Sequence, residues 1–185
     1  AGLDRISTGK ILLENQEIQD WSEAQWADWR RVNVGFVFQD FRLIKSFTAY
    51  ENVSLPLELL GWAPINIRTR TRALFTQLKL EQRLDHYPHQ LSGGEQQRVA
   101  IARAFAHFPK LIFADEPTGN LDPETSESVF QELLHINAQE HTALIMVTHD
   151  MALAQRLQRQ VPLAHGKVDA GTLDTARSTK EDTSS

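Results

Sequence analysis

Apolar residues recur along this chain with two different periods, and each period predicts one kind of secondary structure. Spacings of three and four residues indicate helices, whereas short apolar runs between turn residues indicate strands. The helical pattern begins at Ser22 and recurs at residues 68–80, 95–107 and 127–138. The strand pattern covers residues 9–13, 110–114 and 143–148, a turn is expected at residues 14–16, and a hairpin is expected at residues 161–168. This alternation predicts an α/β domain with a parallel sheet and right-handed crossovers, in which residues 143–148 form a buried strand.

The first predicted helix carries a local start signal. Ser22 and Gln25 have the spacing of a capping box, and Trp21 and Trp26 have the spacing of a hydrophobic staple. Trp29 falls on the same helical face, so we interpret the three tryptophans as packing residues rather than as a ligand-stacking box.

The second predicted helix carries a basic cluster, Arg68, Arg70 and Arg72. Charge runs on helices usually meet water, so we interpret this cluster as a solvated face, with docking of a partner as the alternative.

Composition narrows the class of protein. The chain has 185 residues, 41% apolar content, no cysteine and a net charge of −5. These values suit one globular domain with or without a subdomain, and they exclude disulfides and thiolate metal sites. No apolar run reaches the length of a membrane span, and no basic stripe suggests nucleic-acid binding. We therefore expect a cytoplasmic protein that has no nucleic-acid partner and reaches a membrane only through another protein.

Two motifs indicate phosphate chemistry. Ser92 and Glu95 form a capping-box pattern, and Gly93 and Gly94 leave backbone N–H groups open to an anion. Farther along, an apolar strand pattern ends in two adjacent carboxylates that we expect to be buried, Asp115-Glu116. Adjacent carboxylates suit Mg²⁺-assisted phosphoryl transfer, because one can hold the shell of the ion while the other activates water.

With these motifs the sequence resembles the nucleotide-binding domain of ATP-binding-cassette (ABC) transporters from residue 1 to about residue 168. The resemblance identifies residues 91–96 (Leu-Ser-Gly-Gly-Glu-Gln) as the signature motif, Asp115-Glu116 as the end of Walker B, and residues 118–122 as the D-loop. It further identifies residues 36–39 as the strand and glutamine of the Q-loop, with Gln39 as the glutamine, and His149 as the H-loop histidine. The amino-acid sequences of residues 51–57 and 114–122 are most similar to those of proteins in the lipoprotein-release and macrolide-export branch of the family.

The resemblance also implies a role for each motif residue. Asp115 and Gln39 would bind Mg²⁺ or its water, and Glu116 would polarise the attacking water. His149 would contact the γ-phosphate or position the water. The signature residues Ser92, Gly93, Gly94 and Gln96 would bind ATP held by a second nucleotide-binding domain. Asp122 would sense that second site across the dimer interface, and its alternative role as the N-cap of the next helix is compatible with this one.

One motif of the family is missing from the sequence. No Gly-x-x-x-x-Gly-Lys-Ser/Thr phosphate loop occurs, because Gly9-Lys10 is followed by Ile11 and position 4 is Asp4. The resemblance places the start of the chain just after that loop, so we expect an amino-terminal truncation. The loop normally cradles the phosphates of ATP, so the chain as given is expected to be inactive alone.

We therefore expect a P-loop NTPase-like (RecA-like) α/β core with an inserted helical subdomain. Residues 1–39 would be a partial core, 40–98 the helical subdomain, 99–168 the rest of the core, and 169–185 a disordered tail. The leading hypothesis is an ATPase subunit that binds ATP and Mg²⁺ and powers a membrane permease of the export or lipoprotein-extraction type. It would lie on the inner face of the cell membrane, with permease subunits and a second nucleotide-binding domain as partners. The alternatives are a non-transport ABC ATPase and a non-catalytic remnant that binds a partner.

Overall fold

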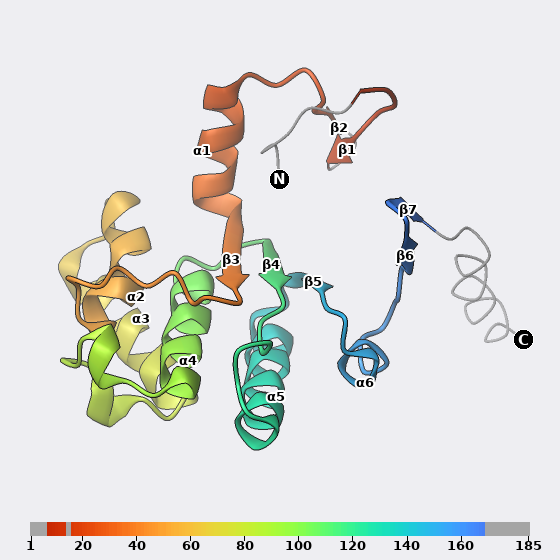
Figure 1. The fold of residues 1–185 in the computed structure, drawn as a ribbon. Helices are drawn as coiled ribbons and strands as arrows, with labels where there is room; N and C mark the ends of the chain where they lie inside the picture. Colours follow the sequence, from red (N-terminus) through yellow and green to blue (C-terminus); the bar gives the residue numbers. More distant parts are fainter. Residues whose placement is uncertain (1–6, 14–15, 169–185) are drawn as a thin grey trace, which may run out of the picture. The chain divides into compact units, whose positions relative to one another are not determined.

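A computed structural model describes residues 7–13 and 16–168, which fall into two compact units that meet between Val147 and Thr148. Figure 1 traces the elements along the chain. The first unit contains β1 (Leu12–Leu13), β2 (Gln16–Glu17), α1 (Glu23–Asn33), β3 (Val34–Phe38), α2 (Ala49–Leu59), α3 (Pro64–Gln77), two 3₁₀ turns (Glu81–Arg83 and Pro88–Gln90), α4 (Gly93–Phe105), β4 (Leu111–Asp115), α5 (Pro123–Glu140) and β5 (Ala143–Val147).

The main sheet of the first unit is parallel, with strand order β3-β4-β5. The register pairs Phe38 with Asp115 and Asp115 with Val147, so the three strands end at one common edge. The predicted parallel crossover is thus confirmed. Helix α4 packs closely on β3 at Gly35, where an added Cβ would lie 2.2 Å from the carbonyl oxygen of Ala104.

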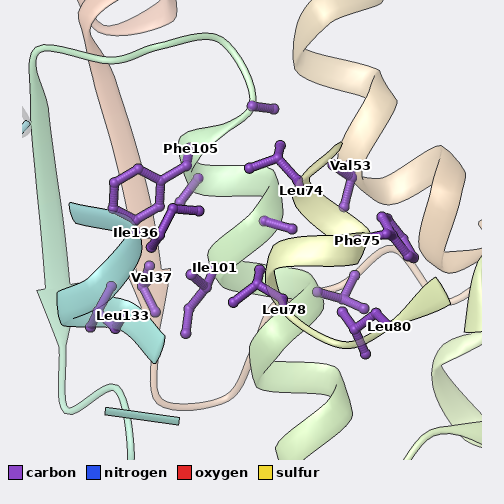
Figure 2. Close-up of a cluster of buried hydrophobic side chains, with 14 of the residues drawn as sticks. Val37, Val53, Leu74, Phe75, Leu78, Leu80, Ile101, Phe105, Leu133 and Ile136 are labelled. Carbon is purple, nitrogen blue, oxygen red and sulfur yellow. The ribbon is translucent and has the colours of Figure 1, made fainter. Parts of the chain in front are cut away.

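The helical elements between β3 and β4 share one apolar core with the sheet. Helices α2 and α3 pack on each other and on α4, and α4 packs on β3 (Figure 1). Figure 2 shows the buried side chains that join these layers: Val37, Val53, Leu74, Phe75, Leu78, Leu80, Ile101, Phe105, Leu133 and Ile136. Burying aliphatic and aromatic side chains of this size contributes about 1.5–3 kcal/mol each. This core holds α4, and with it residues 92–98, in a defined position on the sheet.

The start of α1 confirms the predicted capping box and the packing of the three tryptophans. Ser22 is its N-cap, and both halves of the capping box with Gln25 are formed. Trp21 and Trp26 meet edge to face at 5.1 Å between ring centroids, and Trp29 lies 6.0 Å from Trp26. The tryptophans therefore pack on one another, as the staple pattern predicts.

Several element boundaries differ from the sequence prediction. The strand predicted at residues 9–13 is reduced to Leu12–Leu13, which pairs with Gln16–Glu17. Helix α3 begins at Pro64 rather than at residue 68, because proline is well suited to the first helical turn. Helix α5 begins at Pro123, four residues earlier than its apolar pattern, for the same reason. The turn predicted at residues 14–16 lies mostly outside the described residues.

Two expectations about burial are wrong. Strand β5 is not a buried strand, because Ile145 and Val147 are 49% and 54% exposed. Within the described residues β5 pairs only with β4, so β5 is an edge strand whose other side has no neighbouring strand. The basic cluster on α3 is not wholly a solvated face either, because the side chain of Arg70 is only 10% exposed and pairs with Glu140.

The second unit contains α6 (Met151–Ala154), β6 (Leu163–Ala164) and β7 (Lys167–Val168). The predicted hairpin is confirmed, since β6 and β7 pair antiparallel and His165 and Gly166 turn the chain with φ of 51° and 74°. The tail predicted to be disordered, residues 169–185, lies outside the described residues. Among the helices of the described chain, none has the length and apolarity needed to cross a bilayer.

Candidate functional site

The predicted metal ligand Asp115 and the predicted catalytic residue Glu116 lie at the carboxyl edge of the parallel sheet. Asp115 ends β4 and is exposed, and Glu116 is half-buried. The expectation that both are buried is therefore wrong: the apolar residues Ile112 and Ala114 face the core, and the strand then ends at an open edge. Ligands of parallel α/β sheets bind at such carboxyl edges.

Glu116 has an unusual backbone conformation. Its φ is 43°, in the left-handed region that residues with a Cβ rarely adopt. Its N–H donates to the carbonyl of Val147 at 2.9 Å, and its carbonyl accepts from the N–H of Gly119 at 3.0 Å. Strain of this kind persists where surrounding contacts impose it and is common at active sites.

The predicted Q-loop glutamine contacts the predicted D-loop. The Gln39 side-chain Nε2 donates to Asn120 Oδ1 at 3.2 Å, and Asn120 Nδ2 donates to the backbone carbonyl of Gln39 at 2.9 Å. Gly119 lies against the same side chain, because an added Cβ there would be 2.8 Å from Gln39 Nε2. The structure therefore joins two motifs that are 81 positions apart in the sequence.

The residues after Gln39 form a tight turn that is held by α4. Phe41 and Arg42 have φ of 61° and 45°. Arg103 of α4 donates to the carbonyls of Phe41 and Arg42 at 3.0 and 2.6 Å. The guanidinium of Arg42 lies 4.1 Å from the ring centroid of Phe38. Sequence reasoning missed both Arg103 and Asn120, because neither belongs to a local pattern that reveals its distant partner.

The predicted anion cradle opens α4. Ser92 is the N-cap, its hydroxyl accepts from the Glu95 N–H at 3.3 Å, and Glu95 Oε2 accepts from the Ser92 N–H at 2.8 Å. Arg83 Nε donates to Glu95 Oε1 at 2.6 Å. Desolvation raises the pKa of Glu95, but the hydrogen bonds from Ser92 and Arg83 outweigh it and leave the pKa below its ordinary value. The carboxylate therefore stays ionised and stabilises the helix start.

The two glycines of the cradle permit close packing while leaving donors open. A Cβ at Gly94 would lie 2.4 Å from Thr125 Cγ2, and one at Gly93 would lie 3.3 Å from Leu121 Cδ2. No group of the described residues accepts a hydrogen bond from the N–H of either glycine. Gln96 turns back to its own loop, donating from Nε2 to the Leu91 carbonyl at 3.1 Å. The N–H groups of both glycines therefore have no acceptor within the described residues, as helix starts that bind phosphate oxygens require; Gly93 is half-buried and Gly94 is buried.

Asp122 caps α5. Its Oδ1 accepts from the N–H of Thr125 at 3.0 Å, and the hydrogen bonds with Thr125 lower the pKa of Asp122. The capping role considered in the sequence analysis is confirmed, and the sensing role stays a prediction. His149 follows β5 by two residues and belongs to the second unit, so its catalytic role also stays a prediction.

The structure thus places the predicted residues of the first unit in two groups. Gln39 lies with the loop that follows Asp115 and Glu116, and the signature residues lie beside the start of α5. Arg98 of α4 adds to the second group by donating to Ser128 Oγ at 3.0 Å. Both groups contact α4, the helix whose first turn contains the signature motif: the signature residues form its start, and Arg103 near its end bonds the turn after Gln39.

Comparison with known proteins gives these groups a family context. The family model for ABC transporters matches residues 1–119. The chain is 47% identical to the lipoprotein-releasing system ATP-binding protein LolD of Idiomarina loihiensis, over 89% of this chain and 72% of the relative. It is 49% identical to the uncharacterized ABC transporter ATP-binding protein YbbA of Escherichia coli K12, over 91% of this chain and 74% of the relative.

Solved structures agree with these relatives. The dimeric post-hydrolysis structure of the ATP-binding cassette MJ0796, bound to ADP and Pi, superposes with a TM-score of 0.79 at 38% identity. The match covers 90% of this chain and 74% of that cassette. The expected P-loop NTPase-like α/β fold is thereby confirmed. The chain belongs to the ABC transporter family, as an ATP-binding protein of that family.

Proposed function

We propose that this protein, together with a phosphate loop, binds ATP and Mg²⁺ and hydrolyses ATP to drive a membrane permease. The observation that carries this proposal is the junction of Gln39 with the loop after Glu116 at the carboxyl edge of the sheet. Gln39 follows β3, and Asp115-Glu116 stand at the end of the neighbouring parallel strand β4. This arrangement can hold a metal-bound phosphate on one side and a water molecule on the other.

The donor set fits Mg²⁺. The Asp115 carboxylate is exposed, and Gln39 uses its Nε2 toward Asn120, which leaves its amide oxygen as an acceptor. Both are oxygen ligands, which Mg²⁺ prefers, usually together with water and substrate phosphates. When bound, the ion supplies positive charge that offsets the charge on the phosphates. Asp115 and Gln39 are the residues that would hold it.

The remaining roles follow from position and chemistry. Glu116 orients the attacking water and accepts its proton through the side-chain carboxylate. The free N–H groups of Gly93 and Gly94, with Ser92 and Gln96, bind the phosphates of a nucleotide held by a second copy of the domain. Dimeric MJ0796 supports such a pairing, since it is an ATP-binding cassette solved as a dimer with ADP and Pi. For His149, which belongs to the second unit, the proposed role is to contact the γ-phosphate or to position the attacking water.

The permease partner is supported by a groove beside the Q-loop. A cavity of about 380 Å³ lies between α1, β3, α2 and α4, with Leu55, Pro56 and Leu59 forming an apolar wall. Arg31, Arg42, Arg103 and His107 line its polar side, and none of its lining residues is acidic. Such a groove suits an amphipathic segment that carries acidic residues. We assign it to a permease segment, which would place the protein in the cytoplasm on the inner face of the membrane.

The relatives indicate the type of transporter. One is a lipoprotein-releasing system ATP-binding protein, and the chain resembles it at 47% identity. We therefore propose an export or lipoprotein-extraction system rather than an importer.

ATP hydrolysis tests this function directly. We would measure phosphate release by the 185-residue chain, by a version extended upstream with a phosphate-loop segment, and by the extended version carrying Glu116→Gln. Activity of the extended version that the Glu116→Gln change abolishes is the expected result. Glu124→Gln is the matched control, because Glu124 is an exposed carboxylate eight positions farther along the chain. No activity in any version, with or without a permease, would favour the non-catalytic remnant.

A further inference from the structure

Gln97 is a buried polar residue that the sequence patterns do not single out. It lies in α4 with 0% of its surface exposed, between the half-buried residues Gln96 and Arg98. Glutamine is mostly exposed in proteins, and a buried amide is costly unless it is hydrogen-bonded. Its retention inside the core therefore requires a reason beyond helix formation.

The side chain of Gln97 joins two separate loops. Its Nε2 donates to the carbonyl of Phe38 at 3.3 Å and to the carbonyl of Pro117. Both partners are acceptors, so only the NH₂ end of the amide can face them, and one nitrogen uses both its hydrogens. Pro117 has no N–H, so this carbonyl is its only backbone hydrogen-bonding group.

The position of these two carbonyls matters for the site. Phe38 immediately precedes Gln39, and Pro117 immediately follows Glu116. The same two loops are joined a second time by Asn120, which bonds both the side chain and the backbone of Gln39. Gln97 lies three positions after Gly94, on the helix whose first turn forms the anion cradle. One buried amide thus connects that helix to the loops that carry the metal ligand and the base.

We propose that Gln97 is a positioning residue that transmits the position of the signature helix α4 to the Gln39 and Glu116 loops. This inference rests on the proposed function and deepens it. A nucleotide contacting the N-terminus of α4 biases the placement of that helix. Because Gln97 is rigidly packed and bonded to both loops, Gln39 and Glu116 move with the helix. Engagement of one nucleotide by the signature then aligns the catalytic loop of the same chain.

Hydrogen–deuterium exchange tests the link without requiring activity. Gln97→Met keeps the approximate volume of the side chain and removes both donors. We expect the backbone amides of residues 38–42, 116 and 118–120 to exchange about tenfold faster in this variant, because both loops lose the same anchor. Gln131→Met is the same chemical change on the exposed face of α5, where Gln131 Nε2 donates to Glu127 Oε1 at 2.8 Å, and it should leave both loops unchanged.

A second control separates positioning from general destabilisation. Ile136→Val removes one methylene from the core of α5 and lowers stability without touching either loop. If Gln97→Met accelerates exchange no more than Ile136→Val does, after both are corrected for their urea midpoints, the proposal is overturned. Acceleration in only one of the two loops would overturn it equally.

Kinetics then separates this proposal from the proposed function. In the phosphate-loop-extended protein, Gln97→Met should lower kcat about 10–100-fold with little change in KM for ATP, because small misplacements of catalytic groups are costly. A purely structural role would lower the active fraction and leave the kcat of the folded protein unchanged. If the unsubstituted protein has no ATPase activity, the proposed function fails while the exchange result still decides the role of Gln97.

Discussion

Arg70 provides the sharpest quantitative test of the packing described above. Its Nη1 lies 2.8 Å from Glu140 Oε1, and both side chains are only 10% exposed. Its Nη2 donates to the Phe105 carbonyl at 2.8 Å and its Nε to the Ala106 carbonyl at 3.1 Å. The guanidinium also lies 3.8 Å from the ring centroid of Phe108. Arg70 therefore joins α3 to the ends of α4 and α5, where it satisfies carbonyls that a helix end leaves without partners.

The change Arg70→Met keeps much of the apolar stem and removes every one of these polar contacts. Breaking a buried ion pair from one side costs about 3–5 kcal/mol, because the other charge stays buried. Each hydrogen bond from a charged donor contributes about 1.5–3 kcal/mol, but these contributions cannot simply be added to the cost of breaking the ion pair, because the same guanidinium makes all of these contacts. We therefore expect the free energy of unfolding to fall by about 3–5 kcal/mol.

Urea unfolding followed by tryptophan fluorescence measures this loss. Arg72→Met is the matched control, because Arg72 is exposed on the same helix, and its effect should stay within about 0.5 kcal/mol. The deficit of Arg70→Met should persist in 1 M NaCl, since salt screens buried pairs weakly. If the two variants lose equal stability, or the deficit disappears in salt, the side chain of Arg70 is solvated and the reasoning is wrong.

Three further outcomes follow from the structure. Gly35→Ala should lower the free energy of unfolding by about 1–3 kcal/mol, because its Cβ would overlap the Ala104 carbonyl; chemical denaturation measures this overpacking cost. Asn52→Ala should lower it by a similar amount, about 1–3 kcal/mol, because this buried amide bonds four backbone groups of residues 44–48; an unchanged midpoint would contradict this. Folding lowers the pKa of Glu95, so the ionised carboxylate stabilises the folded protein at pH values above its ordinary pKa. This stabilisation is lost as the pH falls through the pKa that Glu95 has in the folded protein. The stability advantage over Glu95→Gln should therefore shrink below about pH 4.5, which thermal melts across pH 3–7 would show.

Local sequence patterns determined three of the helix starts and the alternation of strands and helices. Ser22, Ser92 and Asp122 each cap a helix through a hydrogen bond to a residue three positions later, so the signal and its partner lie within one turn. Apolar runs likewise predicted β4 and β5, because a strand pattern depends only on neighbouring residues. The family resemblance rested on motifs of the same local kind, and the comparisons confirmed it.

The environment of individual side chains was decided only by the tertiary structure. Gln97 and Arg70 are residue types usually found on the surface, yet Gln97 is buried against two loops and the side chain of Arg70 lies between the ends of α4 and α5. Asp115 has the signature of a buried carboxylate, yet it is exposed where the strand ends. Burial depends on which distant elements pack over a position, and those contacts join residues that no local period relates. The sequence by itself therefore determined the elements and the chemistry, while packing determined which side chains meet.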